Sequence, residues 1–385
     1  MRKYLVLTEL FLPTKGGTAV WFAEVYPRLG GKQIHIVTAA VAGQEAVDES
    51  HPNTIHRLDL QRVAWLKPES LAMYLKLFAR SLRLALTQRF DAVHAGRALP
   101  EGLVAWLVAR LTAHKVVVYA HGEELTTWGK GLKYAAMQFA LRHADLVIAN
   151  SEWTRDELLK MNVAPSSIVL INPGVDIERF RPGLPSDDLR ARLGLSGGQK
   201  LVLSVGRMQQ RKGFDMVIRS LPALLAQGVD VHYAMIGKGE QLEHLQQLAK
   251  DEGVDSRVHF LGHVEAEELP RWYNACDVFA MPNRDINGDT EGFGMVFLEA
   301  AACGRPVIAG ADGGTGSAVE HEVTGLRVDG ASLSAVEHAL GRYLLDASLC
   351  AVTGQRALQR AVEHYSWQDV ARKTAALQFA GAGSQ

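Results

Sequence analysis

The chain has 385 residues, of which 48% are hydrophobic and 22% are charged, and its formal net charge at pH 7 is -1. This length predicts two to three domains of roughly 150 residues each, and the composition is typical of a soluble globular protein. The near-neutral charge excludes a bulk field that would recruit nucleic acid or an anionic membrane.

The apolar run at residues 4–10 contains polar residues and is followed by no small-residue cleavage site, so it predicts a buried strand and not a signal peptide. No stretch reaches the roughly 18 apolar residues that a membrane span needs. Cys276, Cys303 and Cys350 lie far apart, which indicates reduced thiols and neither a disulfide framework nor a zinc cluster. We expect a cytoplasmic protein.

The first half of the chain alternates apolar runs with amphipathic stretches, which is typical of a parallel sheet covered by helices. Helical patterns include Leu99 to Thr112 and Leu132 to Leu141. The expected strands are residues 4–10, 33–39, 91–96, 115–122, 144–151 and 166–174.

Residues 172–188 interrupt this pattern with prolines and glycines, which indicates a linker between domains. A second α/β series follows, and the last pattern, residues 365–380, predicts a helix long enough to cross back to the first domain. The expected strands of the second series are residues 200–208, 230–239, 257–264, 277–283, 305–314 and 324–330.

Candidate binding residues follow the expected strands. Gly16 and Gly17 open a helix, where backbone amides can approach a phosphate, although a glycine pair is also common in plain turns. Arg207 and Lys212 stand five apart around a loop and could converge on one anion, with a solvated basic turn as the alternative. His121 ends a strand and is placed to touch a substrate.

The stretch EGFGMVFLEA places Glu291 and Glu299 eight positions apart. We expect Glu291 in a loop, a turn at Gly292–Gly294, and a helix from about Met295 to Ala302. The glycines would expose free amides at the start of the helix, and the two carboxylates could accept hydroxyls from sugars at both ends of one ligand. Two surface glutamates near a helix start are the alternative interpretation.

Together these residues resemble the retaining glycosyltransferases of family 4, which have the GT-B fold. The hallmark of that family is two glutamates separated by seven residues, as in Glu291 and Glu299. The resemblance spans nearly the whole chain, and residues 281–310 are most similar to bacterial GDP-mannose-dependent enzymes such as the phosphatidylinositol mannosyltransferases. It also includes Gly16-Gly17, His121-Gly122, residues 172–176, Gly206-Arg207, Lys212-Gly213, Leu261-Gly262, Gly313-Gly314 and Glu320.

The resemblance implies an α/β fold of two doubly wound Rossmann-like domains that face each other across a cleft. Residues 1–175 would form the acceptor-side domain and residues 176–365 the nucleotide-sugar domain. Residues 366–385 would form the helix that crosses back. The implied reaction moves a hexose, with mannose favoured, from a GDP-sugar or UDP-sugar to a glycan or lipid-linked acceptor.

The resemblance also implies roles for single residues. Arg207 and Lys212 would hold the donor diphosphate with the amides of Gly16 and Gly17, and Glu299 would bind the ribose. Glu291 and His121 would contact the transferred sugar. Further donor contacts would come from Gly206, Lys238, Gly239, Val264, Phe293, Gly294 and Met295.

No metal site is expected, because side-chain cations replace a divalent ion in this fold and the chain has no Asp-x-Asp triplet. Residues 285–291 imitate the start of a calcium loop, but its sixth position is Thr290 and its twelfth is Val296, so an EF-hand is excluded. Relatives carry proline and glutamate after the second glycine pair, where this chain has Thr315, Gly316 and Ser317.

Residues 69–89, preceded by Trp65 and Leu66, form a basic amphipathic segment. It suits either peripheral contact with the inner face of a membrane or plain packing on the sheet. Three other functions remain as alternatives: a nucleotide-sugar epimerase, a non-catalytic nucleotide-sugar-binding protein, and an NAD-dependent oxidoreductase. The last lacks the Gly-x-Gly-x-x-Gly motif after its first strand.

Overall fold

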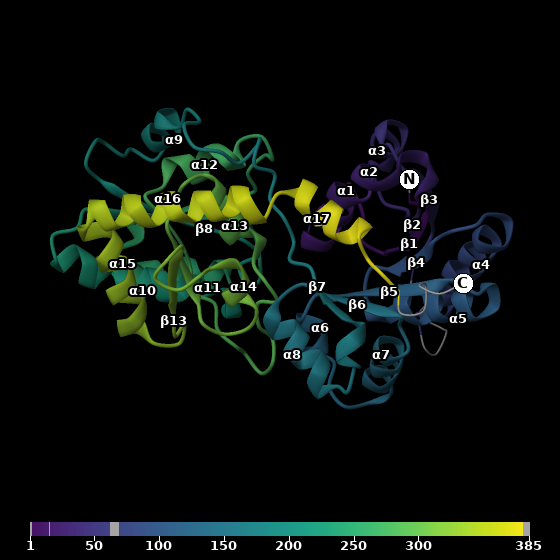
Figure 1. Ribbon diagram of the computed structural model, residues 1–385. Helices are drawn as coiled ribbons and strands as arrows, with labels where there is room; N and C mark the ends of the chain where they lie inside the picture. Colours follow the sequence, from purple (N-terminus) through teal and green to yellow (C-terminus); the bar gives the residue numbers. More distant parts are fainter. Residues whose placement is uncertain (1, 15, 62–68, 380–385) are drawn as a thin grey trace. The chain divides into compact units, whose positions relative to one another are not determined.

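The structure, a computed structural model, describes residues 2–14, 16–61 and 69–379 (Figure 1). The chain forms two compact units. Unit 1 comprises Met1–Pro173 and Trp367–Gln385, and unit 2 comprises Gly174–Ser366. Each unit has its own hydrophobic core.

The described part of unit 1 contains a seven-stranded parallel sheet in the order β3-β2-β1-β4-β5-β6-β7. Its strands are β1 (Tyr4–Leu7), β2 (His35–Ala39), β3 (Thr54–Leu58), β4 (Ala92–Ala95), β5 (Lys115–Ala120), β6 (Leu146–Ala149) and β7 (Ile168–Leu170). Its helices are α1 (Gly17–Val25), α2 (Pro27–Gly30), α3 (Gln44–Ser50), α4 (Leu71–Thr87), the π-helical turn η2 (Ala98–Gly102), α5 (Leu103–Thr112), α6 (Glu123–Thr127), α7 (Leu132–Arg142), α8 (Glu152–Lys160) and α17 (Trp367–Ala375).

Unit 2 contains, among the described residues, a six-stranded parallel sheet in the order β10-β9-β8-β11-β12-β13. Its strands are β8 (Lys200–Val205), β9 (Val231–Ile236), β10 (Val258–Gly262), β11 (Val278–Met281), β12 (Val307–Gly310) and β13 (Gly325–Val328). Its helices are α9 (Asp187–Arg192), the 3₁₀ turn η4 (Gln210–Lys212), α10 (Phe214–Ala226), α11 (Leu242–Asp251), α12 (Leu269–Ala275), α13 (Met295–Ala302), α14 (Thr315–Ala318), α15 (Leu333–Leu345) and α16 (Ala347–His364).

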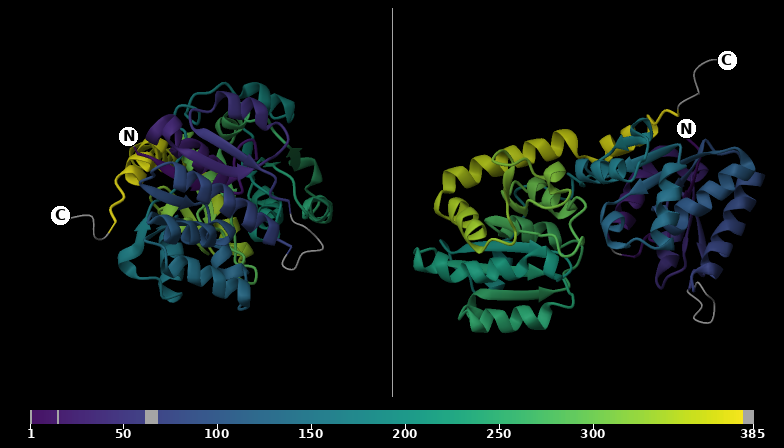
Figure 2. Two further views of the ribbon diagram at one scale, coloured as in Figure 1. Left: turned by 90° about the vertical axis from the view of Figure 1, so that its right-hand side faces the viewer. Right: turned by 90° about the horizontal axis from the view of Figure 1, so that it is seen from below.

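Both sheets are doubly wound, with helices on both faces (Figure 2). Every residue of the central strands β1, β4, β9 and β11 is buried, which explains why these strands are near-continuous apolar runs in the sequence. In each sheet the first and fourth strands along the chain are neighbours, so the strand order reverses between them. The predicted fold class of two doubly wound α/β units is confirmed.

Three details differ from or sharpen the sequence predictions. The helix predicted from about Met295 to Ala302 has those bounds. The helix expected from Leu99 begins instead at Leu103, because Leu99 has extended backbone angles and the residue before a proline is disfavoured in a helix. Strand β3 was missed, because three of the five residues in its sequence TIHRL are polar and all are partly exposed at the sheet edge.

The last helix, α17, belongs to unit 1, although the 193 residues of unit 2 precede it in the chain. It packs against α1 and α2 (Figure 1). Within unit 2, the backbone N–H of Val175 donates to Tyr365 O at 2.7 Å, and Val175 pairs with Ser366 in a parallel bridge. The two segments that connect the units therefore lie side by side where they leave unit 2.

Candidate functional site

In unit 2, the candidate residues gather at the carboxyl ends of β8 and β11. These neighbouring strands mark the point where the strand order reverses, and doubly wound sheets bind ligands there. Gly206 and Arg207 follow β8, and Pro282 follows β11. Gly213 has a φ of 73° and lets the loop after β8 approach the loop after β11 closely, since a Cβ atom on it would lie 2.1 Å from Pro282 O. The turn η4 therefore lies against the end of β11.

An ion-pair cluster formed by Arg211, Lys212, Asp289 and Glu291 lies at this edge. Lys212 Nζ pairs with Glu291 Oε2, and Arg211 Nη1 is 3.3 Å from the same oxygen. Arg211 Nε is 3.0 Å from Asp289 Oδ1. Burial raises the pKa of Glu291, but the charges and hydrogen bonds of Lys212 and Arg211 outweigh it and hold that pKa below its usual value. Glu291 is therefore an ionised carboxylate at neutral pH.

The structure brings Lys212 and Glu291 together but leaves Arg207 outside this cluster. Arg207 is exposed, and no ion pair joins it to the cluster within the described residues. Arg211, which the sequence analysis did not single out, is the second cation of the cluster, and its side chain is only 9% exposed. The sequence presents Arg211 and Lys212 as adjacent cations, and nothing in it shows which one is buried. Convergence of Arg207 and Lys212 on one anion stays a prediction.

A bidentate ion pair supports the cluster. Arg284 Nη1 and Nη2 donate to Asp215 Oδ1 and Oδ2 at 3.0 and 2.9 Å. Asp215 lies in the first turn of α10, and the backbone N–H of Arg284 donates to Arg211 O at 2.8 Å. The pair therefore ties α10 to the loop after β11 and holds the backbone of Arg211. Because its partners are 69 residues apart, the sequence analysis missed it.

The turn before α13 is tightly folded. Gly294 has a φ of 88°, and a Cβ atom on it would lie 2.4 Å from the Phe297 ring. Phe293 is buried, while Met295, the first residue of α13, is half-buried. The backbone N–H of Gly314 donates to Glu291 O at 2.7 Å. The glycine pair after β12 thus packs against the backbone of Glu291.

Glu299 occupies the second turn of α13 and is held by α12. Tyr273 Oη donates to Glu299 Oε2 at 2.6 Å. Burial raises the pKa of Glu299, and the hydrogen bond from Tyr273 and the charge of Arg179 only partly oppose this. In the described residues, no hydrogen bond or ion pair links Glu299 to the Lys212–Glu291 cluster. The sequence analysis missed Tyr273, because this residue occupies an apolar position of a helix and carries no local sign of its contact with Glu299.

The end of β9 packs backbone to backbone against the loop after β8. A Cβ atom on Gly237 would lie 1.9 Å from Gly206 O, and one on Gly239 would lie 2.3 Å from Met208 O. Lys238 O accepts the backbone N–H of Met208 at 3.0 Å, while the Lys238 side chain is exposed. The predicted donor residues Gly206, Lys238 and Gly239 are therefore neighbours. Val264, after β10, is partly buried against the core of the unit.

In unit 1, His121 follows β5 and is fixed by three hydrogen bonds. Its Nε2 lies 2.8 Å from Gly96 O, its backbone N–H donates to Glu124 at 2.8 Å, and its carbonyl accepts from Asn150 at 2.7 Å. Since a carbonyl only accepts, Nε2 carries the proton, and Nδ1 of a neutral imidazole is an acceptor. Gly16 and Gly17 are exposed at the start of α1. Lys15 lies outside the described residues.

A second charged cluster lies in unit 1 after β1 and β4, and the sequence analysis missed it. Glu101 is fully buried, its Oε1 accepts the backbone N–H of Glu9 at 2.7 Å, and Arg97 Nε is 3.7 Å away. Burial raises the pKa of Glu101, although Arg97 opposes the rise. Among the described residues, Glu101 Oε2 and Glu124 Oε2 have no hydrogen-bond partner. Buried polar atoms of this kind usually find a partner, which a ligand hydroxyl or a water molecule could supply.

The basic amphipathic segment at residues 69–89 contains α4, on which Leu75 and Leu86 are 58% and 68% exposed. Two of its cations contact unit 1 itself: Lys76 Nζ is 3.3 Å from Asp59 Oδ2, and Arg80 Nη2 is 2.7 Å from His56 Nδ1. Trp65 and Leu66 lie outside the described residues. None of the described helices has both the length and the apolar character needed to cross a bilayer.

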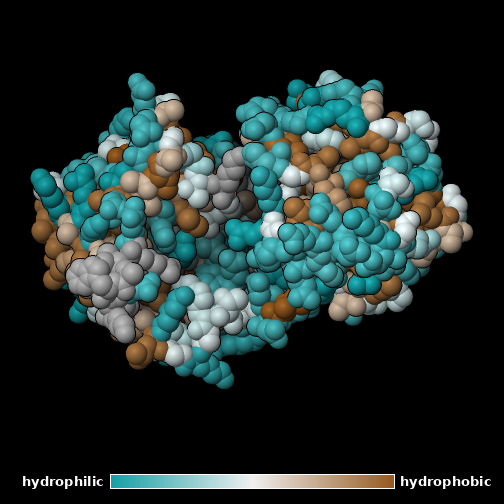
Figure 3. Space-filling view, turned by 180° about the vertical axis from the view of Figure 1, so that it is seen from behind, coloured by the Kyte–Doolittle hydropathy of each residue, from teal (hydrophilic) through white to brown (hydrophobic). Residues whose placement is uncertain are grey.

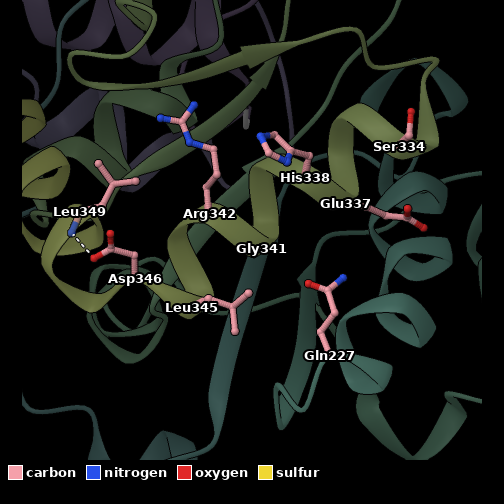
Figure 4. Close-up of a pocket in the computed structure, with 9 residues that line it drawn as sticks. All are labelled: Gln227, Ser334, Glu337, His338, Gly341, Arg342, Leu345, Asp346 and Leu349. Atoms are coloured by element: carbon pink, nitrogen blue, oxygen red, sulfur yellow. Dashed lines mark hydrogen bonds between the residues drawn. The ribbon is translucent and has the colours of Figure 1, made fainter.

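A groove of about 620 Å³ runs along α15 to the end of α10 (Figure 4). It is lined by exposed polar residues such as Ser334 and His338, and Gln227 places it at the amino edge of the sheet, away from Lys212. On the face drawn in Figure 3, apolar side chains are scattered among hydrophilic ones.

In the described parts of the chain, no group of three or more His, Cys, Asp or Glu could hold a metal ion.

Two family descriptions cover most of the chain. Residues 15–179 match the glycosyltransferase family 4 and residues 185–360 match the glycosyl transferases group 1. The chain is 32% identical to a GDP-mannose-dependent alpha-(1-6)-phosphatidylinositol monomannoside mannosyltransferase of Mycolicibacterium smegmatis, over 97% of each chain. It is 29% identical to a GDP-mannose-dependent monoacylated alpha-(1-6)-phosphatidylinositol monomannoside mannosyltransferase of Corynebacterium glutamicum, over 95% of each chain.

Solved structures agree with the fold. Anabaena Alr3699/HepE in complex with UDP has a TM-score of 0.82 and 23% identity, covering 97% of this chain and 98% of that one. Sucrose-phosphate synthase from Thermosynechococcus elongatus has a TM-score of 0.80 and 22% identity, covering 97% of each chain.

Proposed function

The chain belongs to the family 4 glycosyltransferases, and from this we propose that it transfers mannose from GDP-mannose to a lipid-linked sugar acceptor, with retention of the anomeric configuration. The relatives named above use GDP-mannose and mannosylate phosphatidylinositol mannosides. The observation that carries the proposal is the ion-pair cluster of Lys212, Arg211 and Glu291 at the reversal point of the unit 2 sheet.

We assign binding of the nucleotide sugar to unit 2. Lys212 and Arg207 bind its diphosphate, because an ammonium and a guanidinium can neutralise the charge that develops on the leaving group. Glu291 and the amides near Phe293, Gly294 and Met295 orient the transferred sugar. Glu299, held by Tyr273, accepts the ribose hydroxyls. Gly206, Lys238, Gly239 and Val264 lie along the nucleoside.

We assign binding of the acceptor, and some of the contacts with the donor, to unit 1. The amides of Gly16 and Gly17 add positive potential for the diphosphate. His121 presents Nδ1 as an acceptor for a hydroxyl of the transferred sugar, since its Nε2 proton is held by Gly96. The unpartnered carboxylate oxygens of Glu101 and Glu124, with Arg97 beside Glu101, suit an acceptor rich in hydroxyls.

Transfer proceeds through an oxocarbenium-like state, and the departing phosphate takes the proton of the acceptor hydroxyl on the same face of the sugar. Carbon–oxygen bond cleavage places negative charge on the diphosphate, which Lys212 and Arg207 stabilise in place of a divalent metal. The exposed apolar residues of α4 support peripheral contact with a membrane that carries the acceptor.

The test combines binding and turnover. Calorimetric titration of GDP, UDP and ADP identifies the base, and incubation of GDP-mannose with a polar-lipid extract, followed by mass spectrometry and NMR of the product, identifies acceptor and configuration. GDP binding with an α-linked mannolipid supports the proposal. Tighter UDP binding favours a UDP-sugar donor, GDP binding without turnover favours a non-catalytic binding protein, and a β-linked product refutes retention.

Membrane contact has its own test. Because Lys76 and Arg80 are engaged within unit 1, the variant Leu75→Ser/Leu86→Ser is the sharper probe. It should float with liposomes of bacterial lipid less than the wild type does. Leu345→Ser, which changes a 60% exposed leucine of unit 2, is the matched control. Equal flotation of all three proteins would contradict membrane contact through α4.

A further inference from the structure

The amino edge of the unit 1 sheet contains a pocket of about 350 Å³. His121 and Arg97 follow strands at the opposite, carboxyl edge, so the pocket is separate from the residues assigned to transfer. It forms where the adjacent strands β2, β1 and β4 begin. Lys3 precedes β1, Lys32 precedes β2 and Arg89 precedes β4. Three cations from distant parts of the sequence are thereby brought to one cavity.

One of these cations is fixed in place. Lys32 Nζ donates to the carbonyls of His51 and Asn53 at 3.0 and 3.4 Å, which holds the ammonium and leaves it one further proton to donate. No carboxylate is among the described residues that line the pocket. The neighbouring Asp91 accepts the backbone N–H of Lys3 at 2.8 Å through Oδ2. Three cations therefore line the pocket, and the one carboxylate named beside them already accepts a backbone N–H.

The imidazole of His35, which also lines the pocket, has a defined proton position. Arg80 Nη2 can only donate, so His56 Nδ1, 2.7 Å away, is an acceptor and the proton of His56 is on Nε2. That Nε2 is 2.9 Å from His35 Nδ1 and donates to it. The proton of neutral His35 is therefore on Nε2, where it is available as a donor. The side-chain amides of Gln33 and Gln88 complete the polar lining.

We propose that this pocket binds a phosphate group, as free inorganic phosphate or as the phosphate monoester of a lipid headgroup. Two exposed cations, one anchored ammonium and the His35 imidazole line a single cavity, and charge-assisted donors such as these cations are what phosphate oxygens accept. The chain as a whole carries a formal net charge of -1, so this concentration of cations is local. The inference does not depend on the proposed transferase function.

The test follows the His35 ring itself, because the Lys212 region is also proposed to bind phosphate. In the full chain carrying Lys212→Ala, inorganic phosphate is titrated and the imidazole resonances of His35, assigned with His35→Gln, are recorded by NMR. A saturable shift is expected. In the same background, Lys3→Gln/Arg89→Gln should weaken phosphate binding about tenfold or more, since two charge-assisted contacts are lost. Lys250→Gln, which removes an exposed cation of α11 in unit 2, outside the pocket, should change nothing.

Vesicles distinguish the source of the phosphate. Phosphatidylcholine vesicles with and without phosphatidic acid are compared in co-sedimentation with the Lys3→Gln/Arg89→Gln and Lys250→Gln proteins. Binding that needs phosphatidic acid and is lost only in the first variant indicates a headgroup. A His35 shift with phosphate but no such vesicle binding indicates a free anion. No saturable shift of His35, or a shift that both variants retain at equal affinity, overturns the proposal. Circular dichroism of each variant confirms that it is folded.

Discussion

Replacement of Lys212 by alanine is the sharpest test of the cluster in unit 2. The Lys212 and Glu291 side chains are each 13% exposed, so the interaction of Lys212 with a diphosphate oxygen is only partly screened. At an effective dielectric constant of about 20, two unit charges about 4 Å apart interact by about 4 kcal/mol. Because part of this offsets desolvation, we expect a loss of about 3 kcal/mol, or on the order of 100-fold in kcat/KM.

The assay is initial-rate transfer from GDP-mannose, together with calorimetric titration of GDP. Lys212→Arg keeps the charge and should retain more activity than Lys212→Ala, although its planar group fits less well. Lys250→Ala, at an exposed position of α11, is the matched control and should match the wild type. If Lys212→Ala keeps kcat/KM within about threefold of the wild type, less than 1 kcal/mol is involved and the assigned role of Lys212 is wrong.

Three further outcomes are expected. Tyr273→Phe removes the donor that holds Glu299 and should weaken GDP binding about tenfold, because a hydrogen bond worth about 1 kcal/mol no longer orients the carboxyl group; an unchanged calorimetric affinity contradicts the ribose role. Transfer should persist in EDTA, whereas a loss that magnesium restores would argue for a metal. Burial lowers the pKa of His94 to about 3, and burial with the charge of Arg80 lowers that of His56 to about 4, from 6.5. Because the unfolded chain takes up these protons first, urea unfolding should show full stability above about pH 6.5 and a progressive loss towards pH 4; a flat profile over that range contradicts the burial of these rings.

Most strands could be predicted from the sequence because their physical cause is local. A strand buried on both faces must be apolar at nearly every position, so β1, β9 and β11 are visible as continuous runs. Strand β3 lies at the edge of its sheet and carries polar residues, so that signal is absent. The start of α5 was misplaced because the amphipathic pattern already begins at Leu99 and continues through Pro100. The extended backbone of Leu99 delays the start of α5 to Leu103.

The site could be predicted only where its residues are close in sequence. Glu291, Gly294 and Glu299 share one turn and one helix, and the predicted bounds of that helix are confirmed. Arg284 and Asp215 are 69 residues apart, and Glu101 is 92 residues from Glu9. Such pairs depend on which strand ends are neighbours in the sheet, and no local pattern carries that information. The buried state of Arg211 is also a product of tertiary packing.

The two cations of the cluster are not equivalent, and this difference is compatible with the proposed binding of a diphosphate by Lys212. Arg211 contacts both Asp289 and Glu291, while Lys212 contacts Glu291. When Lys212 turns towards a phosphate, Glu291 keeps Arg211 as a partner, so no buried carboxylate is left uncompensated, which would cost several kcal/mol. In the proposed mechanism Lys212 would therefore exchange partners at small cost, while Glu291 stays ionised and keeps the contact with Arg211. Arg211, which the sequence analysis did not single out, makes the predicted roles of Lys212 and Glu291 compatible with each other.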